Sequence, residues 1–265
     1  MANERTDSRP ALLGETVEEE TQEGARMSFL EHLEELRRRI LYAVYSLIAA
    51  CIVPGLYADR IYKWMLAYFH QVLPPEVKMI YTQAADGFMF EVKLVLLVGV
   101  LIASPFIFAQ LWLFVAPGLY AREKKVVIPF VICSTVLFLA GAAFSHYYVF
   151  LMMWGFFETF SNEYIQFVPT IGDAFELYVK MLLAMGAVCQ MPILVFFLVR
   201  FGIITWRFLA RQWKYAILII TVVAAVVTPT PDVPTMLAVA APMVVLYGLS
   251  IGVAWFFRRR DIAQV

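Results

Sequence analysis

Residues 90–115 read FEVKLVLLVGVLIASPFIFAQLWLFV and carry no charged side chain after Lys93. About 20 consecutive apolar residues are enough for an α-helix to cross the hydrocarbon core of a bilayer, which is roughly 30 Å thick. At about 1.5 Å of rise per residue, a helix over this stretch exceeds that thickness. The stretch therefore predicts a membrane-spanning helix.

Five further apolar blocks predict helices of the same kind. The six predicted spans cover residues 40–57, 90–115, 126–154, 174–199, 215–228 and 236–257. The chain is 62% hydrophobic and only 16% charged, which leaves too little polar surface to cover a soluble globule of 265 residues. The sequence therefore predicts an all-α integral membrane protein with six transmembrane helices.

The basic residues predict the orientation of these spans. Thirteen of them flank the spans on one side, namely Arg37–Arg39, Arg122, Lys124, Lys125, Arg200, Arg207, Arg211, Lys214 and Arg258–Arg260. The opposite loops offer only Arg60, Lys63 and Lys78, all after the first span. Because cytoplasmic loops carry the excess of Lys and Arg, both termini are predicted to be cytoplasmic.

The ends of the chain differ in composition from the apolar middle. Residues 1–26 hold seven Asp or Glu against three Arg and contain no apolar core of a signal peptide, so they predict a disordered acidic cytoplasmic tail. Residues 27–257 form the predicted six-helix domain. Residues 258–265 are a short basic cytoplasmic tail.

An acidic segment, MSFLEHLEELRRRI over residues 27–40, runs directly into the first span. Ser28 followed by Glu31 fits a capping box and predicts that a helix begins there. Carboxylates are unexpected at this membrane edge because an anionic leaflet repels them. Glu31, Glu34 and Glu35 therefore suggest a site for a positively charged group, although a helix with simply solvated charges explains them as well.

A second acidic position, Glu123, lies in the short turn between the second and third spans, on the same predicted side of the membrane. It could converge with Glu35 on one cationic ligand. Carboxylates bind guanidinium groups through two parallel hydrogen bonds, which is geometrically specific. The pair therefore suggests a site for a cationic ligand, and a guanidinium group would fit it.

Prolines within or beside the spans predict a kinked and curved bundle, because proline removes a helical hydrogen bond. They are Pro54, Pro105, Pro129, Pro192 and Pro242. The fifth span, residues 215–228, has room for only about 21 Å of helix, which is short for a bilayer.

Ionisable and amide side chains inside the spans suggest an alternative function. Glu176 and Lys180 are spaced for an ion pair within one helix, but such groups can also line an ion pathway. Together with Glu91 and Lys93 they motivate a secondary transporter of a small solute or ion as the alternative. Gln190, deep in the fourth span, is expected to face another helix or a water-filled cavity, since an unpaired amide in hydrocarbon is unfavourable.

Catalytic and metal chemistry are not expected. Residues 248–252 read GLSIG and match a serine-nucleophile pattern, but they lie inside an apolar helix instead of a strand–turn–helix. The three cysteines all fall in apolar spans without CxxC spacing. No nucleotide-binding motif is present, so the sequence predicts neither an enzyme nor a cofactor.

Three motifs, in order and at matching topological places, resemble the TatC family, the multi-span receptor of the twin-arginine protein translocase. They are HLEELR at residues 32–37, WLFVAPGLY at residues 112–120 leading to Glu123, and PTPD at residues 229–232 followed by Leu237 and Pro242. The resemblance covers about residues 28–257.

The resemblance implies a curved, glove-like bundle with a concave face, in the bacterial cytoplasmic (inner) membrane. It implies a function in which paired arginines in the signal peptides of folded proteins are bound. Single-span subunits of the TatA and TatB type are then recruited, copies self-associate in a receptor complex, and the proton-motive force drives export without a cofactor.

The resemblance also implies roles for particular residues. Glu35 and Glu123 would accept the two arginines, Arg37 would support the first of these sites, and Phe114 would shape the groove. The concave face and the contacts with partner subunits would involve Gln190, Thr228, Asp232 and Met236. Some family members carry a glutamate where Gln190 stands, a polar residue where Met236 stands, and a proline at the place of Tyr68.

Overall fold

The computed structural model describes residues 9–72, 79–115, 127–164, 167–200, 203–228 and 233–256. Its elements are α1 (Arg9–Leu56), α2 (Ala58–Val72), α3 (Asp86–Val115), α4 (Val127–Phe144), the π-helix η3 (Ser145–Val149), α5 (Phe150–Glu158), α6 (Ile171–Val188), α7 (Met191–Arg200), α8 (Trp206–Arg211), α9 (Trp213–Val227) and α10 (Val233–Phe256). A lone β-bridge joins Ile80 to Thr170 in this part of the chain. The all-α prediction is confirmed.

Five helical stretches within the described ranges are long and apolar enough to cross a membrane. They are Leu30–Leu56, Asp86–Val115, Ile128–Glu158, Ile171–Val199 and Val233–Gly252. The predicted fifth span forms a shorter apolar helix, Trp213–Val226. The multi-pass membrane class is therefore confirmed, while the sixth crossing stays a prediction.

The first helix is longer than predicted. The structure begins α1 at Arg9, ahead of the predicted helix start at Ser28. The predicted division into an acidic tail, a six-helix domain and a basic tail stays a prediction. Residues 15–26 include five Glu, a residue that favours helix, and Pro10 stands in the first turn, where a proline is tolerated. No proline interrupts the helix before Pro54.

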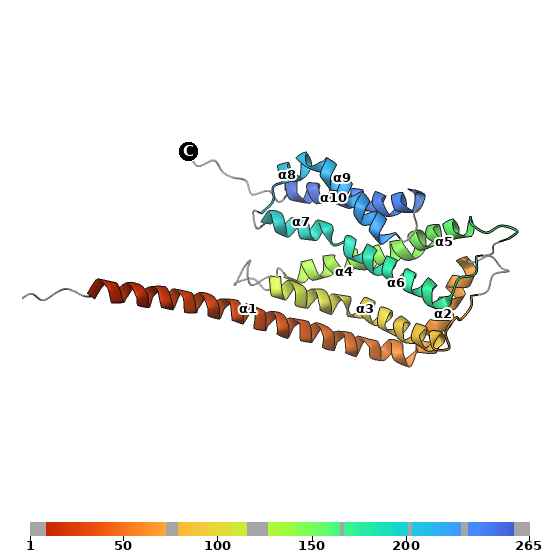
Figure 1. The fold of residues 1–265 in the computed structure, drawn as a ribbon, viewed down its shortest axis with the longest axis horizontal. Coiled ribbons are helices and arrows are strands. Elements are labelled where there is room, and N and C mark those ends of the chain that lie inside the picture. Colours follow the sequence, from red (N-terminus) through yellow and green to blue (C-terminus); the bar gives the residue numbers. More distant parts are fainter. Residues whose placement is uncertain are drawn as a thin grey trace, which may run out of the picture.

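The long helices pack in a series from one side of the molecule to the other (Figure 1). The main contacts pair α1 with α3, α3 with α4, α4 with α6, α7 with α10, and α9 with α10. One end of this bundle carries α2, α5 and the start of α6, and the other carries the end of α3 and α8 (Figure 1). We call these the α2 end and the α8 end.

Only some of the prolines lie where they can kink a helix. Pro105 and Pro242 lie inside α3 and α10, and Pro54 lies in the last turns of α1. Pro129 and Pro192 instead fall in the first turns of α4 and α7, where the missing N–H has no helical partner to lose. The fourth span is broken before Pro192, by a turn at Cys189 and Gln190.

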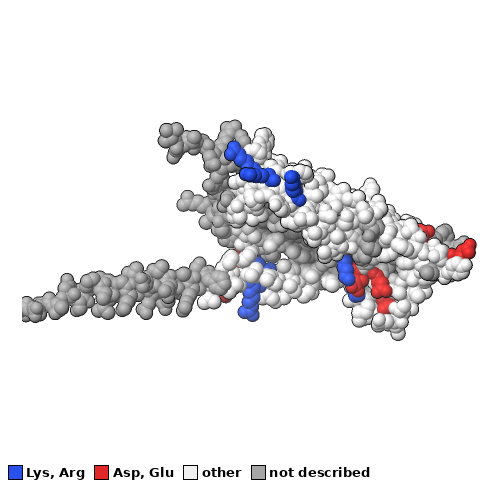
Figure 2. All heavy atoms as spheres, turned by 45° about the horizontal axis from the view of Figure 1, so that its top comes forward, with Lys and Arg blue, Asp and Glu red and all other residues white. Residues whose placement is uncertain are grey.

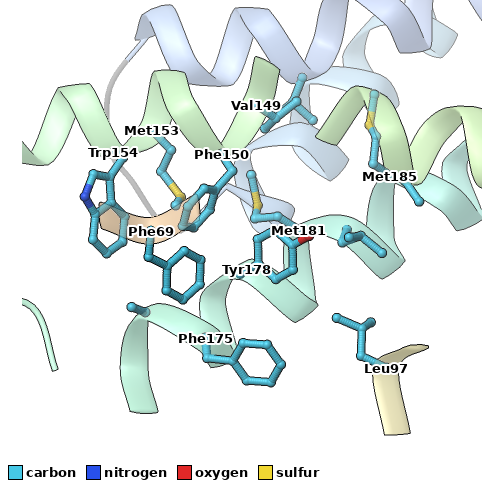
Figure 3. Close-up of a cluster of buried hydrophobic side chains, with 14 of the residues drawn as sticks. Phe69, Leu97, Val149, Phe150, Met153, Trp154, Phe175, Tyr178, Met181 and Met185 are labelled. Atoms are coloured by element: carbon cyan, nitrogen blue, oxygen red, sulfur yellow. The ribbon is translucent and has the colours of Figure 1, made fainter. Parts of the chain in front are cut away.

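The largest core cluster lies toward the α2 end (Figure 3). Phe69 of α2, Phe90 of α3, Phe150 of α5 and Phe175 of α6 are each 1% exposed or less. The rings of Phe90 and Phe175 lie 4.5 Å apart in an edge-to-face arrangement, which is a favourable geometry for aromatic rings. This cluster anchors the loop helix α2 on the membrane spans.

Close helix approach requires small side chains at several places, two of which are Gly99 and Gly141. A Cβ atom at Gly99 of α3 would lie 2.3 Å from the Cys51 sulfur of α1. A Cβ atom at Gly141 of α4 would lie 2.6 Å from the Cys189 sulfur and 2.7 Å from the carbonyl oxygen of Met185. Glycine at these positions lets the backbones approach, as is typical of helix packing in membranes.

The π-helix η3 connects three elements at the α2 end. The Tyr68 hydroxyl of α2 donates a hydrogen bond to the His146 carbonyl oxygen, and the His146 Nδ1 atom lies 2.9 Å from the Tyr178 hydroxyl of α6. The wider turn of a π-helix alters the usual carbonyl pairing, which explains how a side chain can bond there. Burial raises the pKa of Tyr68 to about 12.

Candidate binding site at the start of the first span

The acidic segment lines a hollow of about 570 Å³ on α1. Its lining consists of Glu31, Glu34, Glu35, Arg37, Arg38 and Leu41. Most of these positions are three or four residues apart, so they lie on one face of the helix. Basic side chains stand out on this stretch of α1 and again over α8 and α9 (Figure 2).

Glu35 is the least exposed carboxylate of this group and is already paired. Its Oε1 atom accepts a hydrogen bond from the Arg39 Nη2 atom at 3.1 Å, and the two side chains are 24% and 21% exposed. The Arg39 Nη1 atom donates to the Gln110 Oε1 atom of α3 at 3.3 Å. The residue that contacts Glu35 is therefore Arg39, whereas Arg37 is exposed and lines the hollow.

The predicted groove residue Phe114 lies against the same part of α1. Its ring stacks on the His32 ring, with centroids 4.6 Å apart and an angle of 21° between the planes. His32 and Arg39 are seven positions apart, close to two helical turns, and both contact α3. The face of α1 that packs on α3 therefore adjoins the face that lines the hollow, and Glu35 lies at the boundary between them.

Sequence reasoning missed three residues of this site: His32, Arg39 and Gln110. The signal for Arg39 was available, because Glu35 and Arg39 have the i, i+4 spacing of a helical ion pair. Gln110 carried no such signal, since only the packing of α1 on α3 brings it near Arg39. The predicted site residues Glu123 and Asp232 lie outside the described residues.

Gln190 joins the fourth span to the third. Its Nε2 atom donates to the Ser134 carbonyl oxygen of α4 at 2.9 Å, and the Ser134 hydroxyl accepts from the Trp112 Nε1 atom at 2.7 Å. The Gln190 Oε1 atom is buried without a hydrogen-bond partner among the described residues. The prediction that Gln190 faces another helix is confirmed, and its place on a concave face stays a prediction.

Thr228 and Met236 lie near the junction of α9 and α10. Thr228 is 3% exposed, and its hydroxyl donates to the Ala224 carbonyl oxygen within the same helix. Met236 is partly buried against the main core cluster. Both side chains therefore take part in the packing of this chain, and their predicted contact with a partner subunit is untested.

The charged residues in the spans form an ion-pair cluster. The Lys180 Nζ atom lies 2.7 Å from the Glu176 Oε1 atom, which confirms the predicted pair. The Lys93 Nζ atom of α3 lies 4.0 Å from the other oxygen of Glu176.

The serine of the GLSIG motif, Ser250, is fully buried, and its hydroxyl donates to the Leu246 carbonyl oxygen.

Comparison with known proteins shows which family has this architecture. The family described as Sec-independent protein translocase protein (TatC) matches residues 31–242. A TatC protein of Koribacter versatilis is 40% identical over 238 residues, covering 89% of this chain and 88% of that protein. A TatC protein of Desulforapulum autotrophicum is 36% identical over 242 residues, covering 91% and 89%.

A solved structure agrees with these relatives. The crystal structure of a twin-arginine translocase receptor, TatC, superposes with a TM-score of 0.72 at 29% identity, covering 84% of this chain and 99% of that one. The residues matched by the family include residues 31–40 of the acidic segment, Phe114 and Gln190. This chain therefore belongs to the TatC family of Sec-independent protein translocase components.

Proposed function

We propose that this protein is the receptor of a twin-arginine translocase that binds the paired arginines of signal peptides on folded proteins. The observation that carries the proposal is Glu35. This carboxylate lies at the rim of a hollow of about 570 Å³, with one oxygen held by Arg39 and the other unbonded among the described residues. A carboxylate so placed can accept a guanidinium group.

Glu123 is the proposed acceptor of the second arginine. It follows α3, whose final turn places Phe114 against His32 beside the hollow. Phe114 is proposed to form the apolar wall of the groove. Arg37, which lines the hollow, is proposed to support the first site by contacting polar groups of the peptide backbone.

The membrane setting follows from the charge distribution. Thirteen basic residues flank the spans on the side of the acidic segment, which supports a protein with both termini in the cytoplasm. Its place in a bacterial inner membrane is proposed from its membership of the TatC family. Six crossings, with α9 as the short fifth, agree with this orientation. Signal peptides would therefore arrive from the cytoplasm, the side on which cargo folds.

The export step is proposed to require partners. Single-span subunits of the TatA and TatB type would associate with the helical bundle, with Gln190, Thr228, Asp232 and Met236 near the contact, and copies of the receptor would self-associate. The proton-motive force would supply the energy. The family is a protein-transport family, so a secondary transporter of small solutes is not favoured.

Peptide binding tests the proposal directly. Purified protein in detergent is titrated with a fluorescent signal peptide that contains Arg-Arg and with the same peptide carrying Lys-Lys. We expect Glu35→Gln and Glu123→Gln each to weaken binding of the Arg-Arg peptide by about tenfold, since a hydrogen bond to a charged group is worth roughly 1.5–3 kcal/mol. Glu158→Gln, at the α2 end, is the control and should bind as the wild type does. Equal binding of both peptides by every variant would contradict the receptor function.

A further inference from the structure

Arg39 stands apart from the two arginines that precede it. Arg37 and Arg38 are exposed and line the hollow, whereas Arg39 is only 21% exposed and does not line it. A positive charge that only sets membrane orientation does not need to be held between two helices. The burial of Arg39 therefore indicates a role that its neighbours do not share.

The guanidinium group of Arg39 ties the acidic segment to α3. One terminal nitrogen donates to Glu35 at 3.1 Å and the other donates to Gln110 at 3.3 Å. The guanidinium group is planar and rigid, so fixing one nitrogen on Gln110 also fixes the direction in which the other nitrogen holds Glu35. Gln110, an uncharged residue of α3, thus fixes Arg39, and Arg39 in turn holds Glu35.

This arrangement leaves part of Glu35 available. An ionised carboxylate offers about four lone-pair positions on two oxygens, and Arg39 uses one of them on Oε1. The Oε2 atom accepts no hydrogen bond from the described residues. A guanidinium ligand could therefore add to Glu35 without displacing Arg39.

We infer that Arg39, anchored by Gln110, is a positioning residue that holds the Glu35 carboxylate in the orientation required by a guanidinium ligand. The inference rests on the proposed function. A guanidinium ligand forms two parallel hydrogen bonds and is sensitive to the plane of the carboxylate, whereas an ammonium group is a point charge and is much less sensitive. The Arg39–Gln110 contact therefore determines the preference for arginine over lysine in the ligand.

Arg39 is also a positive charge next to the site, and it repels a cationic ligand. This repulsion acts on Arg-Arg and Lys-Lys peptides alike, because both carry the same charge. The ratio of the two dissociation constants therefore separates positioning from repulsion. Gln110→Leu is the cleanest variant, since it removes the anchor without altering any charge.

The experiment measures both dissociation constants for the full-length wild type, Gln110→Leu and Arg39→Lys, in detergent. Lysine keeps the charge of Arg39 but cannot span Glu35 and Gln110 with a rigid fork. We expect both variants to reduce the preference for the Arg-Arg peptide by about fivefold or more, with little change in the Lys-Lys affinity. Gln71→Leu, an exposed position on α2, is the matched control and should keep the wild-type ratio.

Three results would overturn the inference. An unchanged ratio would mean that Glu35 needs no positioning by Arg39. A parallel loss of both affinities would show that the contact only supports helix packing, and tighter binding of the Arg-Arg peptide would show that Arg39 competes with the ligand. If the wild type itself shows no preference, or Glu35→Gln binds normally, the proposed function fails instead, so the two failures are distinguishable.

Discussion

His32 and Phe114 stack with ring centroids 4.6 Å apart, and this contact joins two motifs that lie far apart in the sequence. His32 opens the HLEELR motif at the start of the first span, and Phe114 lies one residue before the end of α3. The stack holds the wall of the proposed groove against the helix that supplies Glu35. The geometry of the site therefore depends on α1 and α3 keeping their relative positions.

A double-mutant cycle tests this contact. His32→Ala and Phe114→Ala should each lower stability, and the double variant should lose about 1 kcal/mol less than the sum of the single losses, since a stacked ring pair is worth roughly 0.5–1.5 kcal/mol. The free energy of unfolding in detergent, from denaturant titration, is the measurement. Strict additivity would show that the stack contributes nothing of its own.

Gly141 should not tolerate a methyl group. A Cβ atom there would lie 2.7 Å from a backbone carbonyl oxygen of α6, which cannot rotate away as a flexible side chain can. Gly141→Ala should therefore separate α4 from α6 and lower stability by roughly 1–3 kcal/mol, as overpacking does. Gly155→Ala is the matched control, because nothing lies within 4 Å of the added atom. Thermal unfolding should show a loss for the first variant alone.

Tyr68→Phe should loosen the α2 end. The variant keeps the ring stacked on His146 at 4.1 Å but removes the hydroxyl that donates to the His146 carbonyl oxygen. The expected loss is about 1–2 kcal/mol, because a partly buried acceptor is left without its donor. Hydrogen exchange should become faster in α2 and η3. Tyr148→Phe, an exposed neighbour in η3, should leave the exchange rates as they are.

Stability should fall at alkaline pH. Burial raises the pKa of Tyr68 to about 12, and the hydrogen bond between the Tyr62 and Tyr81 hydroxyls raises the pKa of Tyr62 to about 12, against an ordinary value of 10.0. Between about pH 10 and 12 the unfolded chain loses the two hydroxyl protons while the folded chain keeps them, so the stability present below pH 10 is lost as the pH rises. Unfolding titrations across this range should show the decline, and Tyr68→Phe should flatten it. An equally steep decline in that variant would assign the effect to other groups.

Gln190→Leu should separate binding from transport. The variant removes the hydrogen bond to Ser134, which lies on the opposite side of α3 from the acidic segment in the packing series. We expect peptide affinity to stay within about twofold of the wild type while export of a folded reporter declines. Gln190→Glu should retain more export, since it keeps a polar group in the same place. Loss of peptide affinity in Gln190→Leu would contradict this assignment.

The ends of most helices lie within a few residues of the predicted span boundaries. The breaks within the spans, however, do not lie where the prolines predicted them. Pro129 and Pro192 resemble kink sites in the sequence, yet they begin helices. The actual irregularities are the turn at Gln190 and the π-helix around His146. The π-helix includes a carbonyl that accepts from the Tyr68 hydroxyl of another helix, a contact that the local sequence does not reveal.

By itself, the sequence determined that this protein is a helical, multi-pass membrane protein, because hydropathy and length are local properties of each segment. Its motifs also singled out Glu35 and Phe114 as site residues. The i, i+4 spacing already favoured Arg39 as the partner of Glu35, and only the tertiary structure decided that this arginine is also anchored on α3. Arg37, Arg38 and Arg39 are chemically identical, and what separates them is the direction in which each points from α1. The packing of α3 places Gln110 beside Arg39 and leaves Arg37 and Arg38 facing the hollow.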